Sequence, residues 1–209
     1  VTADEYFIKM KNILIEKGVT IYQERPDCFT IRGRLDSEDV DFVMGRRETY
    51  PHSDSRIPEV VIGNLYDELA RRDFTMNAIA EDEDGNLIDP FNGIQDIRDK
   101  IIRCPIDAET SFNDDPLRML RALRFSITKD FDTCSDIDNI IISDTKMWSK
   151  FSEVVSQERI REEVYKMMKH DTVRTIQMLS NYHEMNGVIN ILGRIFAEGM
   201  WLKPTTEKK

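Results

Sequence analysis

Three stretches of the chain carry charged side chains at spacings that could do chemistry, and the first surrounds Asp41. Residues 40–44 alternate like a β-strand, so Asp41 would point to the face opposite Val40 and Phe42. A carboxylate in mid-strand is costly if it is buried without a partner. Two interpretations stay open: an edge strand whose Asp41 faces water, or a carboxylate that acts beside a metal, or as a base, on a sheet that forms the floor of a cleft.

The second stretch is residues 71–78, which begins with two adjacent arginines, Arg71 and Arg72. Near a turn, two such guanidinium groups can bracket a chain of phosphates. Asp73 and Asn77 are four residues apart, so on a helix they would share one face and could reach a ribose hydroxyl together. Ordinary surface charge is the alternative, and the looseness of the pattern favours it.

The third stretch, residues 114–125, is typical of a capped amphipathic helix. Asp114 or Asp115 can cap it, and Pro116 suits its first turn. Leucines and arginines both recur every three positions, and at about 100° per residue the arginines cover roughly a third of the circumference. The leucines are Leu117, Leu120 and Leu123, and the arginines are Arg118, Arg121 and Arg124. With no acidic residue among them, the arginines predict a positive strip that suits a triphosphate.

Asp115 and Arg118 add a more specific possibility. The two residues lie one turn apart. The carboxylate of Asp115 accepts hydrogen bonds and the guanidinium of Arg118 donates them, so together they could read the Watson–Crick edge of a base. The carboxylate would accept a hydrogen bond from an exocyclic amine. The alternative is a helix whose arginines are solvated or salt-bridged, which is the commoner case for an isolated helix.

The elements that must position these residues change in character near residue 104. Strand-like alternation with turn signals precedes this point, and helical spacing follows it, so we expect an α+β first half and an all-α second half. The predicted strands are 19–23, 29–34, 40–44, 59–63 and a short one at Leu87 and Ile88. The predicted helices are 3–17, part of 65–80, 115–127, 136–142, 156–169, 171–182 and 186–198.

Composition limits the class of protein. The 209 residues are 40% hydrophobic and 33% charged, which suits a globular protein of one or two domains. No apolar run approaches the roughly 20 residues of a membrane helix, so no membrane partner is expected. The net charge of −10 argues against a non-specific nucleic-acid binder, so any RNA contact must rest on a local basic patch. The three cysteines form no CxxC pair and predict a reducing, cytoplasmic location.

Taken together, the motifs resemble those of class II tRNA nucleotidyltransferases, the family of CCA-adding enzymes and bacterial poly(A) polymerases. After the strand that carries Asp41, residues 71–78 resemble the family's RRDFTxNA motif and residues 89–93 its DxxxG motif. Residues 114–118 resemble (E/D)DxxR, and residues 158–166 resemble ERIxxExxK. The resemblance rests on five motifs in the right order along nearly the whole chain.

The resemblance implies a nucleotidyltransferase head, a mixed sheet with helices, followed by an all-α neck and the start of a helical body. The implied ranges are 1–103 for the head without its first strands, 104–170 for the neck and 171–209 for the body. The implied activity is template-independent addition of CCA, from CTP and ATP, to the 3′ end of tRNA. Mg²⁺ would be the cofactor of the complete protein.

The resemblance also implies roles for individual residues. The nucleotide-binding set is Arg71, Arg72, Asp73, Asn77, Asp115, Arg118, Arg121 and Arg124. Within it, Arg72, Arg121 and Arg124 would hold the incoming triphosphate. Asp73 and Asn77 would serve the ribose and sugar-phosphate side, and the pair formed by Asp115 and Arg118 would select CTP and then ATP.

Residues outside that set have implied roles too. Asp41 fits the family's third carboxylate and is the candidate catalytic residue. Asp89 and Gly93 would lie at the hinge between head and neck. The structural residues of the neck are Arg159, Glu163 and Lys166, of which Glu163 and Lys166 would brace the helix that selects the base.

One departure from the family matters most. The family's head begins with a glycine pair, a VRD stretch and a DxD strand whose aspartates bind Mg²⁺, and the first acidic residues here, Asp4 and Glu5, do not match it. We therefore expect no metal site in this chain. We also expect a chain that starts inside a longer protein, at Val1, and is inactive by itself.

The motifs leave rival functions open. Within the enzyme class, they do not separate CCA addition from addition of A, of CC or of poly(A). A hypothesis from a different class is a non-catalytic nucleotide- or RNA-binding protein that has lost the DxD strand.

Overall fold

The computed structural model describes residues 2–49 and 59–186 and has the predicted α+β character. The chain divides into two compact units, Val1–Ala70 and Arg71–Lys209. This division falls before the expected end of the head at residue 103, because residues 71–103 pack with the helices that follow them. The ranges of head, neck and body stay a prediction.

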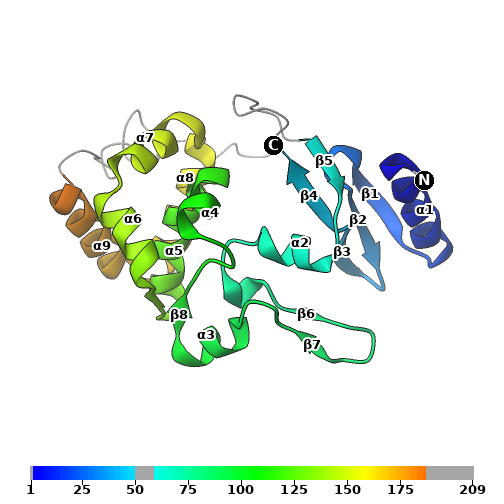
Figure 1. Ribbon diagram of the computed structural model, residues 1–209, viewed down its shortest axis with the longest axis horizontal. Coiled ribbons are helices and arrows are strands. Elements are labelled where there is room, and N and C mark those ends of the chain that lie inside the picture. Colours follow the sequence, from blue (N-terminus) through cyan, green and yellow to red (C-terminus); the bar gives the residue numbers. More distant parts are fainter. Residues whose placement is uncertain (1, 50–58, 187–209) are drawn as a thin grey trace, which may run out of the picture. The chain divides into compact units, whose positions relative to one another are not determined.

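Unit 1 is built on an antiparallel sheet of order β1-β2-β3 with one helix packed against it (Figure 1). Its elements are α1 (Ala3–Glu16), β1 (Thr20–Arg25), η1 (Pro26–Cys28), β2 (Thr30–Leu35), β3 (Glu38–Val43), β4 (Arg46–Thr49), β5 (Glu59–Ile62) and α2 (Leu65–Ala70). A capping box between Thr2 and Glu5 starts α1. The helix then buries Phe7 and Leu14 against Ile31 of β2. This packing leaves the opposite face of β2 and β3 for charged side chains.

Unit 2 is mainly helical and also contains short strands of two residues each. Its elements are η2 (Thr75–Asn77), β6 (Ala80–Glu81), β7 (Leu87–Ile88), α3 (Gly93–Asp99), β8 (Ile101–Ile102), α4 (Ala108–Asp114), α5 (Leu117–Lys129), β9 (Asp132–Thr133), α6 (Ser135–Ser143), α7 (Thr145–Val154), α8 (Gln157–His170) and α9 (Thr172–Asn186). The helix α5 packs against α4 and α8, and α8 packs against α9. Residues of α5, α6, α7 and α8 share one hydrophobic core.

The aromatic pair Phe74 and Phe125 ties the segment before η2 to this core. Both rings are buried, and they meet edge to face with centroids 5.8 Å apart. Because Phe74 follows Asp73 directly, the core fixes the position of a residue that the sequence marked for chemistry. None of the helices within the described ranges has both the length and the apolar character needed to cross a membrane.

Most predicted elements are present, with bounds shifted by a few residues. The sequence analysis missed α3 and α4, which have seven residues each and so fewer than two full turns, and it also missed the longer α7. The helix expected in part at residues 65–80 consists of α2 and the separate turn η2. The helix expected at residues 186–198 lies outside the described residues except for Asn186, the last residue of α9.

Candidate functional site

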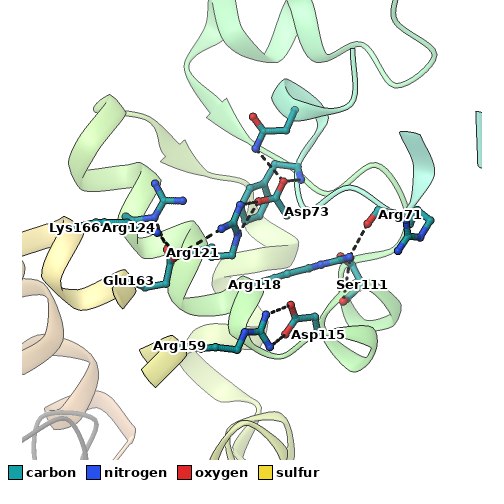
Figure 2. Close-up of polar contacts among 12 residues, drawn as sticks. Arg71, Asp73, Ser111, Asp115, Arg118, Arg121, Arg124, Arg159, Glu163 and Lys166 are labelled. Carbon is teal, nitrogen blue, oxygen red and sulfur yellow. Dashed lines mark hydrogen bonds and ion pairs between the residues drawn. The ribbon is translucent and has the colours of Figure 1, made fainter. Parts of the chain in front are cut away.

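Most of the expected site residues lie in unit 2, around the first two turns of α5 (Figure 2). The helix begins at Leu117 after Pro116, and the Asp115 carboxylate accepts a hydrogen bond from the Leu117 amide at 3.2 Å. Leu117, Leu120 and Leu123 are buried, as the spacing predicted. The arginines therefore emerge along the rim of the core.

Arg118 is held by the elements before α5. Its Nη1 donates to the Ser111 hydroxyl at 2.7 Å and to the Ser111 carbonyl at 3.3 Å. Its Nη2 donates to the Arg71 carbonyl at 2.6 Å. The guanidinium is thus fixed by α4 and by the first residue of the RRDFTMNA segment, as Figure 2 shows.

Asp115 is held by a different element. Arg159, in the first turn of α8, donates from Nη1 to Oδ1 at 3.2 Å and from Nη2 to Oδ2 at 2.7 Å. This bidentate pairing fixes the plane of the carboxylate. The base-selecting residues expected from the sequence therefore lie one turn apart, each positioned by its own neighbour.

Asp73 and Asn77 do meet, but the predicted helix between them is wrong. Asp73 Oδ1 accepts from the Asn77 side-chain amide at 2.9 Å across the short turn η2. The same oxygen accepts from the Phe74 backbone amide at 2.9 Å. The turn η2 follows directly after Phe74, whose backbone is extended and whose ring is fully buried.

Two of the three arginines on α5, Arg121 and Arg124, pair with acidic residues from elsewhere in unit 2. Arg121 donates from Nε to Asp73 Oδ2 at 2.9 Å, and its Nη1 lies 3.6 Å from Glu163 Oε1. Arg124 donates to Glu163 as well, and Lys166 lies 3.3 Å from the same carboxylate. The side chain of Glu163 is only 4% exposed. The ion pairs agree with the alternative of salt-bridged arginines for Arg121 and Arg124, and the carboxylates that form them come from distant residues.

Gly93 occupies a position where any side chain would collide. A Cβ there would lie 2.1 Å from the Thr75 carbonyl oxygen, and the Asp89 carboxylate accepts from the Gly93 and Ile94 amides at 2.7 and 2.9 Å. Thr75 also donates to the buried Asp96 at 2.7 Å. The expected hinge segment thus starts α3 and packs tightly on η2. Its role as a hinge stays a prediction.

Sequence reasoning overlooked several residues that hold this site together. Ser111 and Asp96 lie outside the family motifs considered, and Arg103 pairs with Asp96 at 3.3 Å. The Thr75 amide donates to the Arg103 carbonyl at 2.8 Å. A polar residue that is buried needs partners, but no local spacing reveals which polar residues will be buried.

Asp41 lies in unit 1, on β3, and is exposed. Its carboxylate pairs with Arg32 of β2 at 3.2 Å, and Asp39 pairs with Arg34 at 2.9 Å on the same face. Asp39 and Asp41 have the D-x-D spacing, which the sequence analysis overlooked. Within residues 2–49 and 59–186, no group of three or more His, Cys, Asp or Glu side chains could hold a metal ion. The described residues therefore do not fit an Mg²⁺ site by themselves.

Comparisons with known proteins show what the chain is similar to. Residues 2–103 match the family model described as the poly A polymerase head domain. The CCA-adding enzyme of Lactobacillus johnsonii is 42% identical over 118 residues, which is 56% of this chain and 29% of that enzyme. The CCA-adding enzyme of Geobacillus thermodenitrificans is 34% identical over 155 residues, which is 73% of this chain and 36% of that enzyme.

The fold is similar to that of a solved CCA-adding enzyme. The Bacillus stearothermophilus CCA-adding enzyme, solved in complex with CTP, matches 83% of this chain and 40% of its own length, with a TM-score of 0.64 and 30% identity. The chain thus spans well under half of each of these three proteins. Over the matched ranges the chain is similar to the poly A polymerase head domain and to CCA-adding enzymes.

Proposed function

We propose that the protein adds CCA, from CTP and ATP, to the 3′ end of tRNA, and that Asp115 and Arg118 select the incoming base. The observation that carries this proposal concerns hydrogen bonds. After the bonds to neighbouring residues are formed, Asp115 still has an acceptor position and Arg118 still has donor groups. The chain's similarity to CCA-adding enzymes, over part of their length, supports the same activity.

The carboxylate of Asp115 has one acceptor position left. A carboxylate offers about four lone-pair positions. Two are taken on Oδ1 by Leu117 N and Arg159 Nη1, and one on Oδ2 by Arg159 Nη2. The remaining position on Oδ2 can accept a hydrogen bond from an amine, and Asp115 is 29% exposed, so a ligand can reach it.

The guanidinium of Arg118 has the complementary capacity. Of its five N–H groups, two bond Ser111 and one bonds the Arg71 carbonyl. The two that remain have no partner within the part of the chain that the structure describes. They can donate to ring nitrogen and carbonyl acceptors of a base.

This pattern of one acceptor and two donors fits cytosine and adenine. Both bases present an exocyclic amine beside a ring-nitrogen acceptor, and cytosine adds a carbonyl oxygen on the other side. Uracil and guanine place a carbonyl where the amine would be, so two acceptors would face each other at Asp115. One pair of side chains can thus accept CTP and ATP and reject UTP and GTP.

The remaining residues have proposed roles on the phosphate and ribose side. Arg121, Arg124 and Lys166 carry three positive charges against the two carboxylates of Asp73 and Glu163. One positive charge is left for a triphosphate, and Arg72 would contact the triphosphate as well. Asp73 and Asn77 would contact the ribose.

The proposal also includes a metal cofactor and a catalytic carboxylate. Members of this family generally use divalent metal ions, and we propose Mg²⁺ together with Asp41 as a catalytic carboxylate. The described residues do not form a metal site by themselves. A cytoplasmic location and tRNA as partner are part of the same proposal.

The test is nucleotide choice in the complete protein. In Asp115→Ala, kcat/KM for CTP should fall relative to UTP on a tRNA that lacks CCA, by roughly 5- to 100-fold, because one base contact discriminates by about 1–3 kcal/mol. Asp115→Asn keeps an oxygen for the cap and replaces the other by an amide donor, so it should favour UTP further.

Arg121→Ala is the control, because a phosphate contact carries no base identity. It should weaken CTP, ATP and UTP about equally. If Asp115→Ala lowers CTP and UTP use equally, Asp115 is only a helix cap and the proposal is wrong. Product length on the same tRNA separates CCA addition from addition of A, CC or poly(A).

A further inference from the structure

A buried serine outside the family motifs touches the residue proposed to read the base. Ser111 lies in α4 and is 0% exposed. It contributes two of the three hydrogen bonds to Arg118, through its hydroxyl at 2.7 Å and its carbonyl at 3.3 Å. Figure 2 shows the guanidinium of Arg118 lying between Ser111 and the Arg71 carbonyl.

We propose that Ser111 is a positioning residue for nucleotide selection, whose hydroxyl fixes the orientation of the Arg118 guanidinium. This inference rests on the proposed function. It makes Ser111 a determinant of base choice although it contacts no nucleotide itself.

The hydroxyl is the part of Ser111 that can control orientation. A guanidinium is planar and presents its donors in a fixed fork, so two anchored nitrogens define the direction of the rest. The Arg71 carbonyl anchors Nη2, and the hydroxyl anchors Nη1 at the shorter of its two distances. Without the hydroxyl, Nη1 keeps only the longer contact to the carbonyl, and the free N–H groups lose their fixed direction.

The surroundings of Ser111 hold the hydroxyl rigidly. The helix α4 is capped by Asp107, which accepts from the Thr110 amide at 2.8 Å, and Phe112 next to Ser111 is fully buried. On the inner side lies Cys104, whose pKa burial raises to about 12, and the Ser111 hydroxyl and the Arg118 charge oppose part of that rise. The thiol is therefore neutral at pH 7 and brings no charge that would pull Arg118 away.

Substitutions at Ser111 in the complete protein test the proposal. Ser111→Ala removes the hydroxyl, and Ser111→Cys keeps a side chain of similar shape whose sulfur is a weak acceptor. Both should lower the ratio of kcat/KM for CTP to that for UTP roughly tenfold, the size expected for losing a hydrogen bond to a charged group. Ser111→Thr retains the hydroxyl and should restore most of the ratio.

Ser126→Ala is the matched control, because Ser126 is also a buried serine in the same core but has no contact with Arg118. It should leave the ratio unchanged. Thermal unfolding of each variant accompanies the kinetics. If Ser111→Ala fails to fold, Ser111→Cys decides in its place.

Arg118→Ala separates this inference from the proposed function. If Arg118→Ala loses the preference for CTP and the Ser111 variants keep it, the inference about Ser111 is wrong and the base-reading role stands. If the Ser111 variants weaken all nucleotides equally, Ser111 is only structural. If neither Arg118 nor Ser111 affects the ratio, or the wild-type protein extends no tRNA, the proposed function fails and this inference fails with it.

Discussion

Carboxylates pair with arginines in both units, but the two units place them in different surroundings. In unit 1, Asp41 pairs with Arg32 on an open strand face, and both side chains are about half exposed, at 52% and 49%. In unit 2, Glu163 pairs with Arg124, and the two side chains are 4% and 12% exposed. The two pairs differ in burial.

The difference indicates what each pair can do. An exposed ion pair contributes about 0–1 kcal/mol, because water screens both charges. Its carboxylate can exchange an arginine for another ligand at little cost to stability. A buried pair behaves differently, since removing one partner leaves a charge that water cannot reach. The charged face of β3 can therefore serve chemistry, whereas Glu163 must also hold α5 against α8.

The largest expected effect is that of Glu163→Gln. Glutamine keeps the size of the side chain but leaves Arg124, Arg121 and Lys166 without their shared negative charge. We expect the free energy of unfolding to fall by about 3 kcal/mol. Denaturation by urea, followed by circular dichroism, measures it.

The adjacent Glu162 provides the control for this change. Glu162 lies on the same helix but is exposed, so Glu162→Gln should change the free energy of unfolding by about 0.5 kcal/mol or less. Equal effects of the two substitutions would show that burial does not distinguish the pairs.

An intermediate effect is expected for Asp107, an exposed carboxylate that bonds backbone instead of an arginine. Its carboxylate accepts from the Thr110 amide at 2.8 Å, and this hydrogen bond lowers the pKa of Asp107 from its usual 3.8. Asp107→Ala should cost about 1 kcal/mol of stability at pH 7, the usual value of a helix cap.

The cost of Asp107→Ala should depend on pH in a defined direction. Because the folded-state pKa is lowered, the stabilisation is present above the unfolded-state pKa of 3.8 and is lost as the pH falls through the folded-state value. Urea denaturation at pH 7 and at about pH 2 measures this loss. Asp107→Asn caps the helix without titrating, so it should cost less than Asp107→Ala at pH 7, while its cost relative to the wild type should fall by a similar amount at low pH.

The smallest expected effect on stability is that of Asp41→Asn. Since its pair with Arg32 is exposed, the free energy of unfolding should change by about 0.5 kcal/mol or less. In the complete protein, however, nucleotide addition should be lost if Asp41 is the catalytic carboxylate. Urea denaturation and the rate of CMP addition to tRNA are the two measurements.

Asp39→Asn tests whether this loss is specific. Asp39 lies on the same strand face and has the same kind of partner, Arg34. It should match Asp41→Asn in stability. A large loss of stability from either change would show that the strand face is structural, against the contrast between the two units.

The sequence predicted those parts of the site that depend on neighbours along the chain. The capped start of α5, the inward face of its leucines and the closeness of Asp73 to Asn77 all depend on residues that are near one another in the chain. Such contacts follow from helical periodicity and side-chain reach, so the residue types were enough to infer them. The same local reasoning predicted a longer helix where the structure has the short turn η2. The neighbouring residues do not reveal that Phe74 is buried in the core.

The charge balance of the site was decided by the tertiary structure. Arg124 and Glu163 are 39 residues apart, and Asp115 and Arg159 are 44 apart. The resemblance to a family placed Glu163 beside α5. The pairing of Asp115 with Arg159 and the ion pairs of Arg121 and Arg124 were seen only in the packed structure. Two side chains so distant in the chain meet only because the helices that carry them bury apolar faces against each other. The sequence by itself determined which residues could bear charge, and packing determined which of those charges lie together, away from water.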